Sequence, residues 1–444
     1  MKKIVKKALK IFAVALLAVI AAVCGGYGVL SAITPNPADI RAERIGDPTG
    51  YVIARGKNIY DPSGKLLFFK GINLGDWFIQ EYWMATAGLG FKTDTDEKKV
   101  FETGIYTQKR GLAAMRANQN LTDAQIRELD ALYIDNFIKE EDFAIIAGLN
   151  LNCVRINFSC YNMTTDGYNI DETAFEKIDW ALDMCGKYGL YAILDDHGAI
   201  GSQNMDNHSG NDQTFELYGN EKNENATVAM WEYIASRYKG KYANVLAAYD
   251  LLNEPRSAPH KFTGKVNFDF YDRLYKAIRA IDPERMLIME CFTFPAHGIH
   301  ESVYGWENVS YSYHFYNLTP FSDGFAVNFY RVLHNLMGYD VPIIIGEFSA
   351  WESKDGWNDL MDAFDEWGWS YLSWTYKTNE YIHKQGVPSR RAVLWGVVQL
   401  DIKPVNVYTA TYDEIYAVYS SVGTENAKKT VIYDVFKQRF GGKE

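Results

Sequence analysis

Two glutamates stand at the ends of two strongly apolar stretches of the sequence. Glu254 lies near the end of residues 245–255, whose apolar run predicts a strand buried on both faces and whose Pro255 cannot donate to a sheet ladder. Glu347 ends a second run of this design, residues 341–347. The interval between the glutamates equals three units of about 31 residues, the usual length of one strand–helix unit in a (β/α)8 barrel. We therefore expect both carboxyls at the C-terminal mouth of a barrel, after its fourth and seventh strands.

Two carboxyl groups that face each other across a barrel axis can cleave a glycosidic bond. In the retaining reaction, a double displacement, one group attacks the anomeric carbon while the other protonates the leaving oxygen and later activates water. We assign Glu347 as the nucleophile and Glu254 as the acid/base. An acid must hold a proton near neutral pH and a nucleophile must not, so we expect their surroundings to differ.

Other polar side chains fall at the ends of the remaining expected strands. Arg155 is expected at the end of the second strand, and its charge would keep Glu347 ionised. Asn253 precedes the acid and could donate to the sugar hydroxyl beside the anomeric carbon. Further hydrogen bonds and a flat apolar face for a sugar ring would come from His197, His314, Tyr316 and Trp374. Each residue type is more often structural when it stands alone, but this set gathers on one face of the expected barrel.

Strand and helix patterns alternate from residue 51 to the end of the chain, which predicts the α/β class and a single TIM barrel without internal repeats. Residues 51–69 read as a hairpin around a turn at 61–64, and it could close the bottom of the barrel. We expect barrel strands at residues 66–74, 151–158, 190–195, 245–255, 285–290, 309–313, 341–347 and 370–374. We expect helices at residues 140–147, 174–188, 227–238, 268–281, 321–337, 357–367 and within 412–440.

A long insertion spans residues 84–136, where the loop between a strand and a helix is normally short. Within it, Thr122 followed by Gln125 marks the start of a helix. An insertion at the C-terminal face of a barrel usually shapes the binding cleft.

The N-terminus predicts export of the barrel, residues 51–444. Five lysines in residues 1–10 form a basic tail that would stay in the cytoplasm, and the uncharged residues 11–33 are long enough to span a bilayer. Residues 34–50 read as a stalk. We expect a single-pass protein of the cell membrane with its catalytic part outside, or a secreted protein if residues 11–33 are a cleaved signal. Lipid attachment at Cys24 is a third possibility.

The amino-acid composition limits the kinds of molecule that the protein is expected to bind. A chain of 444 residues with 48% hydrophobic residues can bury a large core. Its net charge of -11, more acidic still without the lysine tail, argues against nucleic acid or anionic lipid headgroups and leaves a carbohydrate as the expected partner. The 5 cysteines show no zinc spacing, and we expect neither metal nor cofactor. The four cysteines after Cys24 could be buried free thiols or could form disulfides, and the sequence leaves both alternatives open.

These residues, taken in order, resemble glycoside hydrolase family 5, the cellulase-like retaining β-glycosidases. The resemblance rests on Arg155, His197, the triplet 253–255, His314, Tyr316, Glu347 and Trp374, and it covers about residues 51–440. It implies a (β/α)8 barrel, double displacement and no cofactor. Residues 71–77, 137–156 and 196–204 look closer to the exo-β-1,3-glucanase branch, although Asp76 stands where that branch has a glycine. By that likeness Glu81, Asp206 and Asn207 would bind hydroxyls of the terminal glucose.

The expected activity is hydrolysis of β-glucans or β-gluco-oligosaccharides with 1,3 or 1,4 linkages, by exo or endo action. A β-mannanase or a glycolipid glycosidase with the same core is the alternative, since a fold does not fix the sugar. An inactive carbohydrate-binding protein is a rival of another class. His208, Asp212 and the tyrosines of residues 304–316 could line the cleft, but solvated loop positions are the simpler interpretation.

Overall fold

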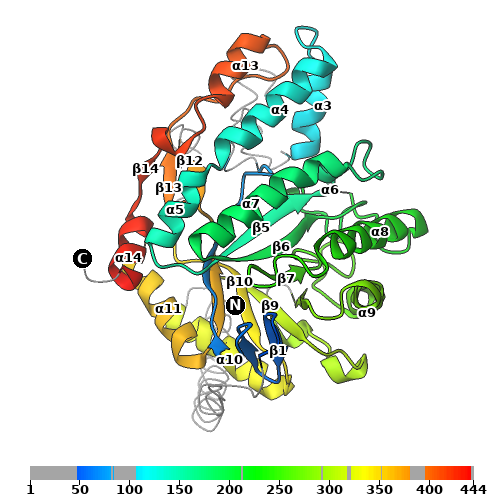
Figure 1. Cartoon of the computed structure of the whole chain (residues 1–444), viewed down its shortest axis with the longest axis vertical. Helices are drawn as coiled ribbons and strands as arrows, with labels where there is room; N and C mark the ends of the chain where they lie inside the picture. The colour runs from blue at the N-terminus through cyan, green and yellow to red at the C-terminus, as the bar shows by residue number, and fades with distance from the viewer. Residues whose placement is uncertain are drawn as a thin grey trace, which may run out of the picture.

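A closed barrel of eight parallel strands forms the centre of the molecule (Figure 1). The computed structural model describes residues 48–81, 84, 107–211, 214–291, 294–317, 322–351, 353–380 and 396–441. Around the barrel the strands follow the order β10-β11-β4-β5-β6-β7-β8-β9, and each pairs in parallel with its neighbours. Their bounds are β4 (Lys70–Asn73), β5 (Cys153–Ser159), β6 (Tyr191–Gly198), β7 (Leu246–Asp250), β8 (Met286–Glu290), β9 (Val309–Tyr316), β10 (Ile343–Ser349) and β11 (Ser370–Ser373). The (β/α)8 prediction is confirmed.

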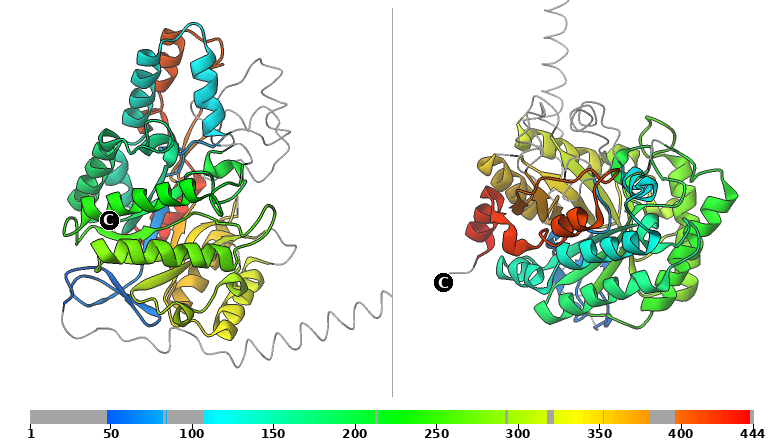
Figure 2. Two further views of the ribbon diagram at one scale, coloured as in Figure 1. Left: turned by 90° about the vertical axis from the view of Figure 1, so that its right-hand side faces the viewer. Right: turned by 90° about the horizontal axis from the view of Figure 1, so that it is seen from above.

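Helices alternate with these strands and cover the outside of the barrel (Figures 1 and 2). They are α5 (Glu140–Gly148), α6 (Cys160–Met163), α7 (Phe175–Tyr188), α8 (Glu221–Tyr238), α9 (Lys265–Ile281), α10 (Asp323–Met337), α11 (Lys354–Trp367) and α14 (Val431–Phe440). Short 3-10 helices occur at η2 (Glu172–Ala174), η3 (Asn207–Ser209), η4 (Pro295–His297), η5 (Glu301–Val303) and η6 (Thr424–Asn426). The apolar faces of the helices join the outward side chains of the strands in one large buried cluster.

The expected hairpin closes one end of the barrel. β1 (Ile53–Arg55), β2 (Asn58–Tyr60) and β3 (Leu66–Leu67) form an antiparallel sheet. Ala54 and Ile59 from this sheet share a buried cluster with Ile193 and Ala248 from the barrel strands. The expected strand 66–74 is therefore split, because its first residues pair with β2 and only β4 enters the barrel.

Two helices of the insertion pack beside a C-terminal helix. α3 (Gln108–Ala117), α4 (Asp123–Phe137) and α13 (Tyr412–Tyr419) lie together beyond the barrel (Figures 1 and 2). The helix start predicted at Thr122 is confirmed, because Thr122 and Gln125 form a capping box at the beginning of α4. The ring centroids of Tyr133 in α4 and Tyr419 in α13 lie 5.4 Å apart, so this contact joins the insertion to the C-terminal helix.

A small sheet near this helix group was not expected. It consists of β12 (Lys377–Asn379), β13 (Val398–Leu400) and β14 (Lys428–Lys429). Strands of two or three residues are too short to show an apolar period, so the sequence pattern gave no sign of them.

The predicted tail 1–10, membrane or signal segment 11–33 and most of the stalk 34–50 lie outside the described residues. Among the helices that the structure describes, none combines the length and apolar character that crossing a bilayer requires. The four cysteines of the described part are all buried free thiols: Cys153, Cys160, Cys185 and Cys291.

Candidate active site

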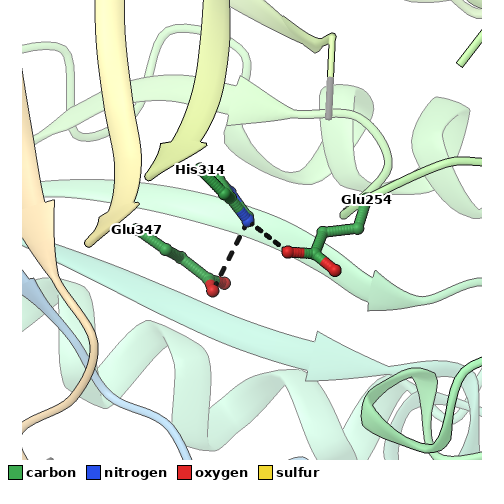
Figure 3. A group of neighbouring side chains, drawn as sticks. All are labelled: Glu254, His314 and Glu347. Carbon is green, nitrogen blue, oxygen red and sulfur yellow. Dashed lines mark hydrogen bonds and ion pairs between the residues drawn. The ribbon is translucent and has the colours of Figure 1, made fainter. Parts of the chain in front are cut away.

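The two predicted catalytic carboxyls meet at the C-terminal mouth of the barrel, on opposite sides of one imidazole (Figure 3). Glu347 lies on β10, the seventh barrel strand, and Glu254 follows β7, the fourth. Nδ1 of His314, on β9, lies 2.7 Å from Oε1 of Glu254 and 3.4 Å from Oε2 of Glu347. One carboxylate oxygen of each glutamate and one ring nitrogen of His314 lie within 4.8 Å of one another. Both glutamates belong to the expected fourth and seventh strand units, but Glu254 lies beyond the end of β7 and Glu347 lies within β10.

Glu254 has a backbone conformation that its neighbours must stabilise. Its φ is 45°, in the left-handed region that side chains with a Cβ rarely adopt. Its N–H donates to Oε2 of Glu290 at 2.6 Å, and its carbonyl accepts from the side-chain amide of Asn204 at 3.1 Å. Glu254 is thus fixed by a side chain from strand β8 and one from the loop after β6, and such strain is common at functional sites.

Glu347 is held by a cation and a phenol, as a nucleophile requires. Arg155 Nη1 donates to its Oε1 at 3.0 Å, and the Tyr316 hydroxyl donates to its Oε2 at 2.7 Å. The Glu347 side chain is 6% exposed, so these contacts are made largely out of water. The expected pairing of Arg155 with Glu347 is confirmed.

Arg155 also binds three further buried carboxyls. Its guanidinium nitrogens lie 2.9 Å from Asp195, 2.9 Å from Asp250 and 2.7 Å from Glu290. Burial raises the pKa of Asp250 well above its usual value, although the charge of Arg155 acts in the opposite direction. Burial also raises the pKa of Asp195, but Arg155 and His197 outweigh it and lower that pKa, so Asp195 stays ionised.

Imidazoles contact both oxygens of Glu254. His314 contacts Oε1, and Nε2 of His208 lies 3.1 Å from Oε2. Burial favours the neutral acid, but the two histidines outweigh burial and lower the pKa of Glu254 well below its usual value. The surroundings of the two carboxyls therefore differ, as expected: Glu254 contacts His208 and His314, whereas Glu347 accepts hydrogen bonds from Arg155 and Tyr316.

His197 and Asn253 line the same mouth. His197 Nδ1 lies 2.7 Å from Oδ2 of Asp195, and its ring stacks on Trp374 at 5.1 Å with an interplanar angle of 12°. The Asn253 side-chain oxygen accepts from Arg155 at 3.0 Å, so its amide nitrogen is directed toward His197 Nε2, 3.3 Å away. The structure thus places one face of the Trp374 ring against His197.

The residues expected to bind the terminal sugar lie around this centre. Glu81 is 4% exposed, and its negative charge acts on both His208 and Tyr316, which places it beside the two carboxyls. Asp206 forms an ion pair with Arg256 at 2.6 Å. Asn207 begins η3 in the same loop and is half-buried.

Asp76, the departure from the exo-glucanase pattern, has a simple backbone explanation. Its φ is 62°, in the region where glycine is favoured and where aspartate is among the better tolerated alternatives. The Tyr133 hydroxyl, from α4, donates to its carbonyl oxygen at 2.5 Å. The aspartate therefore keeps the turn that a glycine would make.

Three contributors were missed by sequence reasoning. Glu290 ends the expected fifth strand, so the rule that found Glu347 could have found it. His208 was interpreted as a solvated loop residue, and its contact with Glu254 links positions that no local pattern connects. Trp351 is half-buried next to Tyr316, with ring centroids 6.1 Å apart, and offers an aromatic face near the nucleophile.

Two groups of side chains among the described residues are spaced like metal ligands, but each already has a cationic partner. Asp195, Asp250 and Glu290 surround the Arg155 guanidinium. Glu254 and Glu347 flank His314. Burial lowers the pKa of His314, but the charges of Glu290 and Glu347 outweigh burial and raise this pKa well above its usual value. The charges of Arg155 and His314 supply what a metal would, so we assign no metal to either group.

A closed barrel with two carboxyls paired at its mouth is the architecture of a glycoside hydrolase. The model of the cellulase family, described as glycosyl hydrolase family 5, matches residues 115–380 of this chain. This match spans more than half of the sequence and includes every site residue named above except Glu81 and Asp76. The chain belongs to the cellulase family, glycosyl hydrolase family 5.

Individual relatives match about half of their own length. A β-xylosidase of Phanerodontia chrysosporium is 28% identical over 61% of this chain and 53% of its own. A glucan 1,3-β-glucosidase of Pichia angusta is 31% identical over 47% of this chain and 45% of its own. Among solved structures, rutinosidase from Aspergillus niger has a TM-score of 0.54 at 12% identity, over 70% of this chain and 90% of its own. An endogalactoceramidase has a TM-score of 0.55 at 16% identity, over 83% of this chain and 84% of its own. These structures support the fold.

Glu290 is expected to position both catalytic carboxyls. Its carboxylate contacts Arg155, and Arg155 in turn holds Glu347. The Glu290 carboxylate also lies 3.2 Å from His314 Nε2 and accepts a hydrogen bond from the backbone N–H of Glu254. Replacing Glu290→Gln keeps the shape but removes the charge that these donors share, so kcat should fall about ten- to a hundredfold. Steady-state kinetics check this, with the exposed Glu307→Gln as the matched control. A change confined to KM would contradict it.

Proposed function

We propose that this protein is a retaining β-glycosidase that hydrolyses β-glucans or β-gluco-oligosaccharides by double displacement. The observation that carries the proposal is the spacing of the two carboxyls. An oxygen of Glu254 lies within 4.8 Å of an oxygen of Glu347, which supports the short separation of a retaining enzyme rather than the roughly 6.5–9.5 Å of an inverting enzyme. Retaining enzymes hold the two groups about 5–5.5 Å apart.

The surroundings of the two carboxyls support different roles. Glu347 receives hydrogen bonds from Arg155 and Tyr316, which favour the ionised form that attacks carbon. Glu254 contacts two imidazoles that can carry a proton. In the first step the Glu347 oxygen bonds to the anomeric carbon as the leaving oxygen takes a proton from Glu254. In the second, water displaces Glu347 and gives a proton to Glu254.

The sugar is proposed from relatives and from the mouth of the barrel. Relatives named glucan 1,3-β-glucosidase support a 1,3-linked β-glucan as the first substrate to test. Glu81, Asp206 and Asn207 would bind hydroxyls of the terminal glucose. A β-xyloside is the second candidate because of the β-xylosidase relative, and the 1,4-linked glucans remain in the substrate panel.

Product analysis tests this proposal. Residues 36–444 would be incubated with laminarin, mixed-linkage glucan, carboxymethylcellulose, mannan and a xylo-oligosaccharide, with Glu347→Ala as the inactive control. We expect glucose as the first product from laminarin, initially as the β-anomer, which NMR distinguishes from the α-anomer. A ladder of oligosaccharides would mean endo action, and early α-glucose would contradict the retaining mechanism. Activity on mannan or xylan oligosaccharides alone would contradict the glucan assignment.

We further propose that the N-terminal segment carries the barrel out of the cytoplasm, as a membrane anchor at residues 11–33 or as a cleaved signal. The support is the lysine-rich start followed by an uncharged stretch. Fractionation of the expressed full chain, with N-terminal sequencing of the recovered protein, separates the two. Recovery of uncleaved protein in the cytosol would contradict both.

A further inference from the structure

His208 lies directly against the proposed acid/base. Its Nε2 is 3.1 Å from Oε2 of Glu254, and its side chain is 20% exposed. The loop that carries it is fixed at both sides: the N–H of Lys109 in α3 donates to the carbonyl of Gly210 at 3.0 Å, and Ser209 Oγ donates to the carbonyl of Asp206 at 2.8 Å. His208 is therefore presented to Glu254 by a defined loop.

The same nitrogen of His208 faces a hydrogen-bond donor as well as an acceptor. The side-chain amide nitrogen of Asn204 lies 3.2 Å from Nε2. The orientation of that amide is set by two other contacts, because its oxygen accepts from the N–H of Asp206 and its nitrogen donates to the carbonyl of Glu254. Protonated Nε2 can donate to Glu254, and unprotonated Nε2 can accept from Asn204. Both protonation states of His208 thus have a partner in place.

We propose that His208 and Glu254 act as a pair that shares one proton, with His208 storing the proton that Glu254 delivers to the leaving group. This proposal rests on the proposed retaining glycosidase function. His208 acts through Glu254 and does not touch the reacting bond, so it is a positioning residue for the proton.

The proton balance follows from the double displacement. In the resting pair His208 is protonated and Glu254 is ionised. As the glycosidic bond breaks, the leaving oxygen takes a proton from Glu254, which receives the proton of His208 Nε2, and Glu347 bonds to the anomeric carbon. Neutral His208 then accepts from Asn204. In the second half, water gives its proton to Glu254 as the hydroxide part displaces Glu347, and that proton returns to His208.

The charges around His208 favour this resting state. The titratable groups that face it are Glu254, Asp206, Glu81 and His197, and Arg256 pairs with Asp206. Burial lowers the pKa of His208, but Glu254, Asp206 and Glu81 outweigh burial and raise it to about 10. The singly protonated pair therefore persists through neutral and mildly alkaline pH. Without His208, the proton would sit on Glu254 alone and be lost at lower pH.

The test is the variant His208→Gln, whose amide can donate to Glu254 but cannot carry the proton. We expect kcat/KM for laminaritriose, which has a poor leaving group, to fall about tenfold or more. A dinitrophenyl β-glucoside needs no acid, so its bond-breaking step should change by less than about twofold. The alkaline limb of the pH profile for laminaritriose should move to lower pH. The exposed His260→Gln is the matched control and should change none of these.

Equal losses on both substrates, or an unmoved alkaline limb, would overturn the role of His208 while leaving the glycosidase function intact. A wild-type chain that cleaves neither substrate would overturn the proposed function and this inference with it. Imidazole nitrogen NMR gives a readout independent of turnover and of the His208 variant's folding. The His208 signal should titrate above neutral pH in the wild type and at lower pH in Glu254→Gln, and an unchanged titration would also overturn the proposal.

Discussion

Replacing Glu347→Ala is expected to abolish turnover, lowering kcat by roughly 10⁴-fold or more, because it removes the carboxylate that we propose forms the covalent intermediate. The Arg155 and Tyr316 donors that hold the carboxylate would remain, so the loss should appear in kcat with every leaving group. Initial rates on laminarin and on a dinitrophenyl β-glucoside measure it.

The matched control is Glu232→Ala, which removes an exposed glutamate from α8. This control should keep wild-type rates, and thermal unfolding of both variants should show that Glu347→Ala is folded. Turnover that survives in the folded Glu347→Ala protein would contradict the nucleophile assignment.

Replacing Glu254→Ala is expected to affect substrates unequally. Cleavage of laminaritriose should fall by about 10²–10⁴-fold, because its leaving oxygen must be protonated. A dinitrophenyl β-glucoside should still form the glycosyl-enzyme, which then accumulates because no base activates water. Added azide needs no base, so it should restore turnover and give a β-glycosyl azide.

Burst kinetics and NMR of the azide product measure this result, with Glu254→Gln as the isosteric comparison. An α-glycosyl azide would contradict the retaining mechanism. Equal losses on both substrates, without azide rescue, would show that Glu254 does not act as the acid/base.

The barrel was predictable because its signals are local. A strand buried on both faces needs an unbroken apolar run, and the polar residue that ends such a run must face the mouth. This reasoning found the strands that carry Glu347, Arg155 and His314, although Arg155 lies near the start of β5 and not at its end. It placed Glu254 at a strand end, although β7 ends at Asp250 and Glu254 follows in a left-handed turn that its own sequence does not encode.

The protonation of the site was not predictable in the same way. The low pKa of Glu254 depends on His208, which a separate loop brings to 3.1 Å, and the loop position depends in turn on α3 of the insertion. Such contacts join segments far apart in the chain and leave no period in the sequence. The β12–β13–β14 sheet was missed for a different reason, since strands this short carry too few residues for a pattern.

The arrangement around Arg155 has a consequence for which sugars the site can accept. Asp195, Glu254, Glu290 and Glu347 stand close to the mouth, and these four carboxyl groups outnumber the cationic partners that they contact, Arg155, His314 and His208. The floor of the site is therefore net negative where an oxocarbenium ion would develop positive charge. Uronic acids and sulfated sugars would be repelled from this floor, whereas a protonated iminosugar, which carries its cation at the same place, would be drawn to it.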